Sequence, residues 1–406
     1  MEVLVVIGQC LKVNSSANIA HCAYIQGLID NGANVDLLTG SDEGQIVDSN
    51  IIVPKVDNIY EYSTLSLYER ISGLKSKVNN SMVNGTSYQS SKMQHKYGIK
   101  QFLKRKIRDL YGIHGQVIVW YRRARKFNVK KKYDLIISLS YPMTSHLLVK
   151  VLRKRRQIIG KKWIQIWEDP WSLDLVNTNK NKRTKDEELK LLKAADEIVY
   201  VSPITLEYQK KLFPNEKDKM KWYPLPCYMK DNDYKYISSN EKKDIVFGYF
   251  GDYMPTVRNL KPFYSVMSNK TNCTYICGSP NDLFKSTHNI RIYPRLSLDR
   301  LREYEEKTSI IIVLCNLRGG QIPGKIYQYS TSSKIILLIL DGSEEEKEKI
   351  KNYFEKYERF IFCENTVEDI SKTIDYIIED YSKLINNVKP IYDFTPKNIV
   401  KQILEN

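Results

Sequence analysis

Two uninterrupted aliphatic runs, residues 309–315 (SIIIVLC) and 334–340 (KIILLIL), constrain the fold of this chain most. Apolar runs of about seven residues are typical of strands that are buried on both faces, as in a parallel sheet. A Gly/Pro-rich turn, residues 319–324, lies between them and is followed by a short stretch that contains Lys325 and Gln328. The sequence therefore predicts a strand, a turn, a short helix and a second strand of an open α/β sheet.

Lys325 and Gln328 fall in the first turns of this predicted helix, after the carboxyl end of a strand. Open α/β sheets bind ligands at that edge, and the free backbone amides of a helix start suit phosphate. Lys325 adds a positive charge, and Gln328 can hydrogen-bond a sugar or a base. In the alternative interpretation Lys325 is a solvated helix residue and the glycines only turn the chain.

The segment PGKIYQY…SSKIILLI resembles the nucleotide-sugar loop of GT-B glycosyltransferases. That loop has the form Pro-x-Lys-φ-φ-Glu-Tyr, a short gap, and a strand that opens with a small residue and Lys-Pro. Gln328 stands where most members have a ribose-binding Glu, and Ile335 replaces the usual Pro. The resemblance implies that Gly324 and Lys325 bind the donor's diphosphate and that Gln328 orients the donor.

A second candidate donor loop follows the strand-like run 244–250, with Gly251, Asp252 and Arg258 after it. This is the form of the first strand, loop and helix of a nucleotide-binding Rossmann half. In the GT-B resemblance the loop approaches the donor's diphosphate, and these three residues are its candidate donor-binding residues. The planar fork of Arg258 matches two phosphate oxygens, and Lys261 is the second candidate cation. The alternative is a surface charge on a helix.

The first half of the chain opens with the strand-like run 3–7, which ends at Gly8, and a loop that contains Asn14. A helix and a second strand follow, as in a Rossmann-type βαβ opening. No Gly-x-Gly-x-x-Gly is present, so a dinucleotide cofactor is not indicated. His146 lies in a helix after the predicted strand 133–139. Gly8, Asn14 and His146 are the candidate acceptor-binding residues.

Glu168 and Asp169 directly follow the predicted strand 163–167, with Pro170 after them and a tryptophan on either side. Burial against tryptophan raises the pKa of a carboxyl group and makes a usable general base. Asp169 and Glu168 are therefore the candidate catalytic residues. The alternative is that Asp169 only caps the turn that Pro170 opens.

The positive charge of the chain lies almost entirely in its first half. Residues 1–225 contain 37 Lys and Arg against 22 Asp and Glu, whereas the remainder contains 26 against 25. The segment 96–132 is the most basic, has apolar positions at helical spacing, and contains Trp120 and Phe127. Such a segment suits an anionic membrane surface, or else it packs its apolar side on the core while its lysines reach water. No nucleic-acid-binding signature accompanies it, so no nucleic-acid partner is expected.

Composition indicates a two-domain protein of the cytoplasm. The chain has 406 residues and no apolar stretch of about eighteen that would predict a transmembrane helix. Its first residues read as a strand and show no basic n-region or small-residue cleavage site, so export by a signal peptide is not expected. The seven cysteines lie mostly in apolar runs, as reduced core residues do, and no Cys/His pair near Cys273 and Cys277 indicates a metal site.

The alternation of strands and helices, together with the resemblance, predicts an α/β fold of two facing Rossmann-like domains, GT-B, with an interdomain active-site cleft. The expected acceptor-binding domain spans residues 1–225 and the expected nucleotide-sugar-binding domain spans 226–385. A C-terminal helix within 386–406 is expected to cross back to the first domain.

The resemblance implies a metal-independent glycosyltransferase, a hexosyltransferase of the capsular or exopolysaccharide type, which needs no cofactor. The donor would be a nucleotide sugar, most simply a UDP-sugar, and the acceptor a lipid-linked saccharide at the inner face of the plasma membrane. The Glu-x7-Glu pair of retaining members falls on Gly320 and Gln328 and is absent. Xanthan-type glucuronosyltransferases, which use Lys and Gln at this spacing and an N-domain Asp as base, are similar. An inactive partner subunit and a nucleotide-sugar epimerase are the alternatives.

Overall fold

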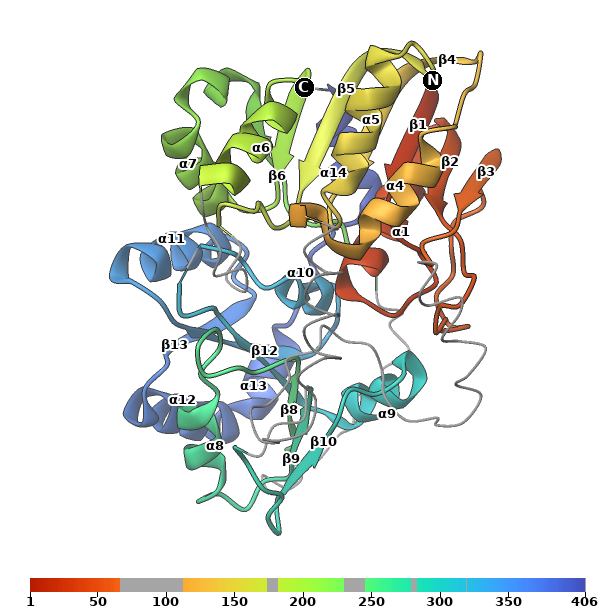
Figure 1. Cartoon of the computed structure of the whole chain (residues 1–406). Coiled ribbons are helices and arrows are strands. Elements are labelled where there is room, and N and C mark those ends of the chain that lie inside the picture. The colour runs from red at the N-terminus through yellow and green to blue at the C-terminus, as the bar shows by residue number, and fades with distance from the viewer. Residues whose placement is uncertain (66–111, 174–181, 230–244, 279–282, 319, 406) are drawn as a thin grey trace, which may run out of the picture. The chain divides into compact units, whose positions relative to one another are not determined.

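The structure is a computed structural model, and it describes residues 1–65, 112–173, 182–229, 245–278, 283–318 and 320–405 (Figure 1). The chain divides into two compact units. One consists of Met1–Val13, Ala33–Glu168 and Asn181–Ile198, and the other of Asn14–Gly32, Asp169–Lys180 and Val199–Asn406.

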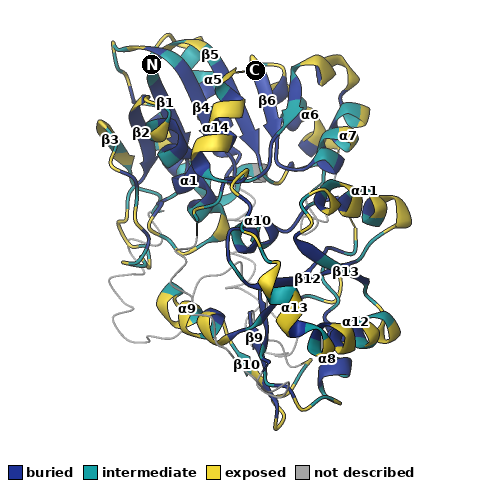
Figure 2. Ribbon diagram, turned by 180° about the vertical axis from the view of Figure 1, so that it is seen from behind, coloured by how far each residue is buried: buried dark blue, intermediate teal, exposed yellow. Residues whose placement is uncertain are grey.

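The first sheet has seven strands in the order β3-β2-β1-β4-β5-β6-β7. Their bounds are β1 Glu2–Ile7, β2 Asn34–Gly40, β3 Asn58–Tyr62, β4 Lys132–Leu139, β5 Ile159–Trp167, β6 Glu197–Tyr200 and β7 Met220–Trp222. The pairings among β1 to β5 are all parallel. The central strands are almost wholly buried, as Figure 2 shows in dark blue, so their side chains make up the core of this sheet.

The second sheet has six strands in the order β10-β9-β8-β11-β12-β13, and all its pairings are parallel. Their bounds are β8 Phe247–Phe250, β9 Thr274–Cys277, β10 Ile290–Tyr293, β11 Ile310–Leu314, β12 Ile335–Leu340 and β13 Phe360–Glu364. The two aliphatic runs form β11 and β12, which pair in register from Ile310 and Ile335, with every residue buried. The prediction of two buried, parallel strands is therefore confirmed.

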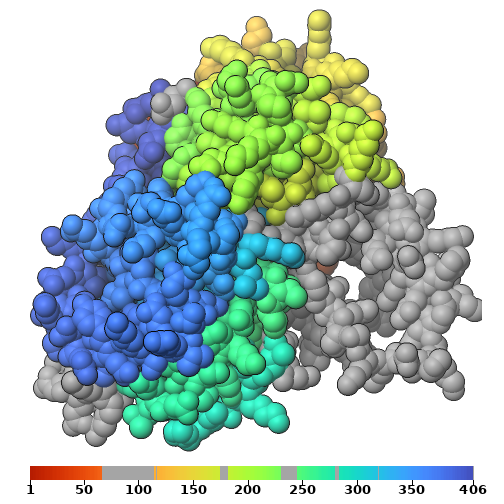
Figure 3. Space-filling view, turned by 90° about the vertical axis from the view of Figure 1, so that its left-hand side faces the viewer, coloured from red at the N-terminus to blue at the C-terminus, as the bar shows by residue number. Residues whose placement is uncertain are grey.

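The helices of the described residues connect these strands, and several begin at a side chain that caps them. Ser15, Ser202, Ser343 and Thr366 each accept a hydrogen bond from a backbone amide of the following turn. Figure 3 shows α11 and α12 in blue across the surface of the molecule. The helices are α1 Ser16–Asp30, η1 Gly112–Val117, α4 Ile118–Ala124, α5 Thr144–Lys154, α6 Lys182–Leu192, α7 Pro203–Leu212, η2 Pro214–Lys219, α8 Lys261–Met267, α9 Leu298–Lys307, α10 Lys325–Ser330, α11 Glu344–Glu355, α12 Val367–Glu379, α13 Tyr381–Asn386 and α14 Pro396–Glu405.

The last helix, α14, packs against α1, and both belong to the second compact unit. The two helices approach closely at Gly27, where an added Cβ would lie 2.3 Å from the carbonyl oxygen of Pro396. The Asn31 amide also donates a hydrogen bond of 2.9 Å to the carbonyl oxygen of Lys397. The contact therefore joins the beginning of the chain to its end.

Part of the basic segment 96–132 can be compared with the structure, because residues 112–132 are described and 96–111 lie outside the described residues. Trp120 and Phe127 are buried in the core of the first sheet, and the Trp120 indole donates a hydrogen bond of 3.1 Å to the carbonyl oxygen of Thr39. Both aromatic residues thus pack inward, as the core-packing interpretation predicts. Across the described residues, no helix combines the length and the hydrophobicity needed to span a bilayer.

Candidate functional site

The second sheet has a topological switch point between β8 and β11. The chain continues from β8 to β9 on one side, whereas β11 pairs with β8 on the other side. Open α/β sheets bind ligands at the carboxyl ends of the strands beside such a point. Gly251 and Asp252 follow β8 there, and Cys315 and Asn316 follow β11.

Arg258, a predicted donor-binding residue, bridges the two strands that flank this switch point. Its Nε donates a hydrogen bond of 2.7 Å to Oδ1 of Asn316, and its Nη1 lies 3.5 Å from the carbonyl oxygen of Asp252. The backbone amide of Leu317 donates to the carbonyl oxygen of Val257 at 2.8 Å, which ties the same two loops together. The guanidinium is therefore fixed at the edge where a ligand is expected. Asn316 was not predicted from the sequence, although its place directly after a buried strand was a usable signal.

Asp252, the second predicted donor residue of this loop, forms an ion pair with Arg295. Nε of Arg295 donates to Oδ1 of Asp252 at 3.0 Å, and its Nη2 contacts the other carboxylate oxygen. The hydrogen bonds that Arg295 donates to the Asp252 carboxylate raise the pKa of Arg295, which stays charged. Because Arg295 comes after β10, the pair links the ends of two strands. The two guanidinium groups of Arg258 and Arg295 therefore outnumber the one carboxylate of Asp252, the residue that both contact at this edge of the sheet.

The helix α10 begins at Lys325, as the sequence predicts, with Gly324 as the residue before its first turn. The Lys325 side chain is half-buried, and its Nζ lies 3.4 Å from Oη of Tyr329 and 5.4 Å from the centre of that ring. Burial raises the pKa of the Cys277 thiol, at the end of β9, to about 12, and the nearby positive charge of Lys325 opposes this rise. Gln328, half-buried, lies one turn along the same helix. Lys325 and Arg258 thus both stand at the carboxyl edge of this sheet.

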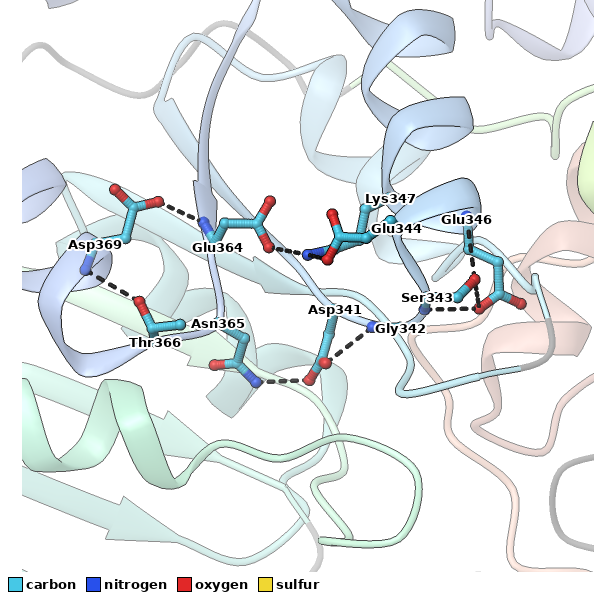
Figure 4. Close-up of polar contacts among 10 residues, drawn as sticks. All are labelled: Asp341, Gly342, Ser343, Glu344, Glu346, Lys347, Glu364, Asn365, Thr366 and Asp369. Carbon is cyan, nitrogen blue, oxygen red and sulfur yellow. Dashed lines mark hydrogen bonds and ion pairs between the residues drawn. The ribbon is translucent and has the colours of Figure 1, made fainter.

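The ends of β12 and β13 form a polar network beside the Arg258 loop (Figure 4). The Asn365 amide donates to Oδ2 of Asp341 at 2.6 Å and to the carbonyl oxygen of Asn259 at 2.9 Å. Ser343 and Glu346 exchange hydrogen bonds in a capping box at the start of α11. The network joins Asn259, the residue after Arg258, to the ends of β12 and β13, and it was not predicted from the sequence.

In the first unit, Gly8 and His146 lie near the carboxyl ends of β1 and β4. The Gly8 amide donates a hydrogen bond of 2.9 Å to Oγ of Ser145. His146 is fully buried, with its Nδ1 at 2.7 Å from Oγ of Ser138 and its ring centre 4.5 Å from that of Trp167. These contacts place His146 in the core of the sheet.

The candidate base residues and Asn14 lie closer to solvent. Glu168 is half-buried, and its backbone amide donates a hydrogen bond of 3.1 Å to Oγ of Ser140. Asp169 is exposed, so the burial against tryptophan that the sequence analysis expected is not present at its side chain. Asn14 is exposed in the loop before α1.

Comparisons with known proteins give a fold and no family. No protein-family model matches the sequence, and no curated protein matches it. Among solved structures, sucrose-phosphate synthase from Thermosynechococcus elongatus is similar over 100% of this chain and 97% of its own, with a TM-score of 0.56 and 10% identity. Anabaena HepE in complex with UDP-glucose covers 100% and 98%, with a TM-score of 0.57 and 11% identity. A glycosyltransferase from Rickettsia africae covers 100% and 96%, with a TM-score of 0.55 and 13% identity. The two parallel α/β sheets therefore have the GT-B fold, as predicted.

Proposed function

We propose that this protein is a glycosyltransferase that moves a sugar from a nucleotide sugar, most simply a UDP-sugar, to a saccharide acceptor. The observation that carries the proposal is the position of Arg258. Its hydrogen bond to Asn316 holds the guanidinium at the switch point of the second sheet, where open α/β sheets bind ligands. The GT-B fold and the similarity to a structure bound to UDP-glucose support it. No cofactor is needed in this proposal.

The donor's diphosphate would be bound by Arg258, Lys325 and the backbone amides at Gly324 and Lys325. Stabilising the leaving diphosphate is a main requirement of this reaction, and preorganised cations and amides meet it without a metal ion. Gln328, one turn into α10, would hydrogen-bond the ribose or the sugar. Gly251 and Asp252 would keep the loop after β8 in place, since the Asp252 carboxylate is engaged by Arg295.

The acceptor hydroxyl would lose its proton to Asp169, with Glu168 as the alternative base. The solvent-accessible position of Asp169 suits a group that meets a large saccharide. Gly8 and Asn14 remain the proposed acceptor contacts, whereas the burial of His146 favours a role in holding β4 and β5 in place.

The conformation of Gly320 argues against the Glu-x7-Glu pair of retaining members and in favour of a separate general base such as Asp169. Its φ is +64°, and an added Cβ would lie 2.2 Å from Cγ2 of Ile204. A glutamate at this position would need both a strained backbone and a displaced neighbour. The loop in this conformation therefore does not accommodate the first acid of that pair.

The setting that we propose is the synthesis of a surface polysaccharide, capsular or extracellular, on a lipid-linked acceptor. The support is the charge of the first half, which suits an anionic membrane surface at the cytoplasmic side. Vesicles with and without anionic lipid would test this part, because binding through segment 96–132 must weaken as salt is raised.

The donor can be identified by thermal-shift measurements with UDP-, GDP-, CMP- and dTDP-sugars, since a ligand of the folded state raises Tm. We expect one nucleotide class to raise Tm, and Lys325→Ala and Arg258→Ala to remove the effect. Lys351→Ala, an exposed lysine on α11, is the matched control and should leave it unchanged. If no nucleotide sugar raises Tm, the proposal is wrong.

Turnover separates the remaining alternatives. Asp169→Asn should abolish transfer to the acceptor while donor binding persists. A sugar nucleotide that is converted without any acceptor would instead indicate an epimerase. Donor binding without turnover on any saccharide acceptor would indicate an inactive partner subunit.

A further inference from the structure

A buried carboxylate, Glu305, lies on α9 close to the proposed donor site. Only 2% of its surface is exposed. Its Oε1 accepts a hydrogen bond of 2.5 Å from Oη of Tyr329, which is itself buried on α10. Such a short contact between a hydroxyl and a carboxylate oxygen is typical of a strong, charge-assisted hydrogen bond.

Lys325 completes this arrangement from the other side of the tyrosine. It precedes Tyr329 by one helical turn, so the two side chains lie on the same face of α10. The Lys325 ammonium is 3.4 Å from the phenol oxygen, and that phenol donates its own hydrogen to Glu305. A phenol that donates to a carboxylate becomes a better acceptor, and therefore it holds the ammonium more firmly.

The position of the three side chains in the fold follows from Cys277, the last residue of β9. Lys325 and Glu305 both act on the pKa of this thiol, Lys325 lowering it and Glu305 raising it, while burial is the main cause of its rise. The arrangement thus lies at the carboxyl end of β9, next to β8 and its switch point.

We propose that Glu305 is a positioning residue for the donor's diphosphate: acting through Tyr329, it holds the Lys325 ammonium at the carboxyl edge of the sheet. The inference rests on the proposed function, in which Lys325 binds that diphosphate. A free lysine side chain loses rotamer entropy when a ligand immobilises it. An ammonium that is already held loses less, so the diphosphate binds more tightly.

A structural role would look similar in the folded protein, because the Glu305–Tyr329 hydrogen bond also fastens α9 to α10. The two roles differ in their dependence on Lys325. A positioning residue has no effect on diphosphate binding once Lys325 is removed, whereas a structural residue keeps its effect.

The test is a double-mutant cycle on the full-length chain, with UDP and uridine as calorimetric probes. We expect Lys325→Ala to weaken UDP binding by a factor of about ten or more, and Glu305→Gln and Tyr329→Phe by a factor of about three to ten each. In the Lys325→Ala background the latter two should have no further effect. Uridine, which lacks the phosphates, should bind equally to all variants. Glu303→Gln, an exposed glutamate on the same helix, is the matched control.

The outcomes separate this inference from the proposed function. If Lys325→Ala leaves UDP affinity unchanged, the proposed donor site is wrong. If Lys325→Ala weakens UDP but Tyr329→Phe does not, or if their effects add fully, the positioning role alone is wrong. Tyr329→Phe keeps the buried ring, so it decides the question even if Glu305→Gln fails to fold.

Discussion

Nε of Arg258 donates a 2.7 Å hydrogen bond to Oδ1 of Asn316, although 58 positions separate the two residues in the chain. The bond joins the loop after β8 to the loop after β11, across the switch point of the second sheet. A guanidinium held in this way presents its remaining N–H groups in a fixed orientation. Diphosphate recognition should therefore depend on Asn316 as well as on Arg258.

Replacing Asn316 with Leu removes the acceptor and keeps a side chain of similar size. We expect the nucleotide sugar to bind about tenfold more weakly, since an unheld guanidinium must be ordered by the ligand. Arg258→Lys should cost at least as much because lysine lacks the planar fork. Calorimetry with the donor measures both effects. Arg302→Lys, at an exposed position on α9, is the control, and an equal loss there would contradict the prediction.

Gly320 should tolerate no side chain, whereas Gly32 should tolerate a small one at moderate cost. Both have positive φ, +64° and +77°, but an added Cβ meets Ile204 at 2.2 Å in the first case and nothing within 4 Å in the second. Gly32→Ala should lower the free energy of unfolding by about 1–2 kcal/mol. Gly320→Ala should lower it by about 1–3 kcal/mol more, because the core must also move. Chemical denaturation of the two variants measures the difference. Equal losses in the free energy of unfolding would show that the Ile204 side chain moves aside at no cost.

Asp36 gives the first unit a stability that depends on pH. Its buried carboxylate accepts hydrogen bonds from Asn58, Tyr133 and Lys131 at 2.8, 2.7 and 3.1 Å. Burial alone would raise its pKa, but these hydrogen bonds outweigh it and the pKa is lowered. A lowered pKa in the folded state stabilises the protein above the unfolded value of about 3.9, and this contribution is lost as the pH falls through the folded value.

Tyr133→Phe removes one of these donors and should lower the free energy of unfolding at pH 7 by about 1–3 kcal/mol. The difference from the wild type should stay constant between about pH 6 and 8, where Asp36 is ionised in both states, and shrink below about pH 4. Urea unfolding at several pH values measures it. Tyr60→Phe, on the edge strand β3 next to the strand that carries Asp36, controls for loss of a phenol. A difference that grows in acid would contradict the assignment.

Ser343 and Ser297 both precede helices, and the structure distinguishes them. Ser343 accepts from the backbone amide of Glu346 in a capping box, whereas the Ser297 side chain makes no such bond. Ser343→Ala should therefore lower the free energy of unfolding by about 1 kcal/mol, and Ser297→Ala by clearly less. Thermal unfolding of the two alanine variants compares them. If both lose the same amount, the capping box contributes nothing measurable.

The strands that could be predicted were those whose own residues carry the signal. The aliphatic runs of β11 and β12 predict strands buried on both faces of a sheet, and in the structure both strands are fully buried. The edge strand β3, with the sequence NIYEY, has no continuous apolar run and is mostly exposed or half-buried, and it was not predicted.

The candidate site shows the same division. Lys325 and Arg258 could be identified because a Gly-rich turn precedes Lys325 and a single glycine, Gly251, marks the end of the strand before Arg258. Asn316 was marked only by its place after β11, and Glu305 by no local pattern, because each acts through a partner that is distant in the chain. The polar network between Asp341, Asn365 and Asn259 escaped prediction for the same reason.

The close packing of α1 against α14 has a consequence for how the protein is made. Helix α1 leaves the ribosome early, yet the surface that it packs against lies around Pro396 and Lys397, and Lys397 follows Asn31 by 366 positions. Until α14, Pro396–Glu405, has been synthesised, this flank of α1 lacks the helix that covers it. A chain that is cut before Pro396 would leave the same flank exposed to solvent.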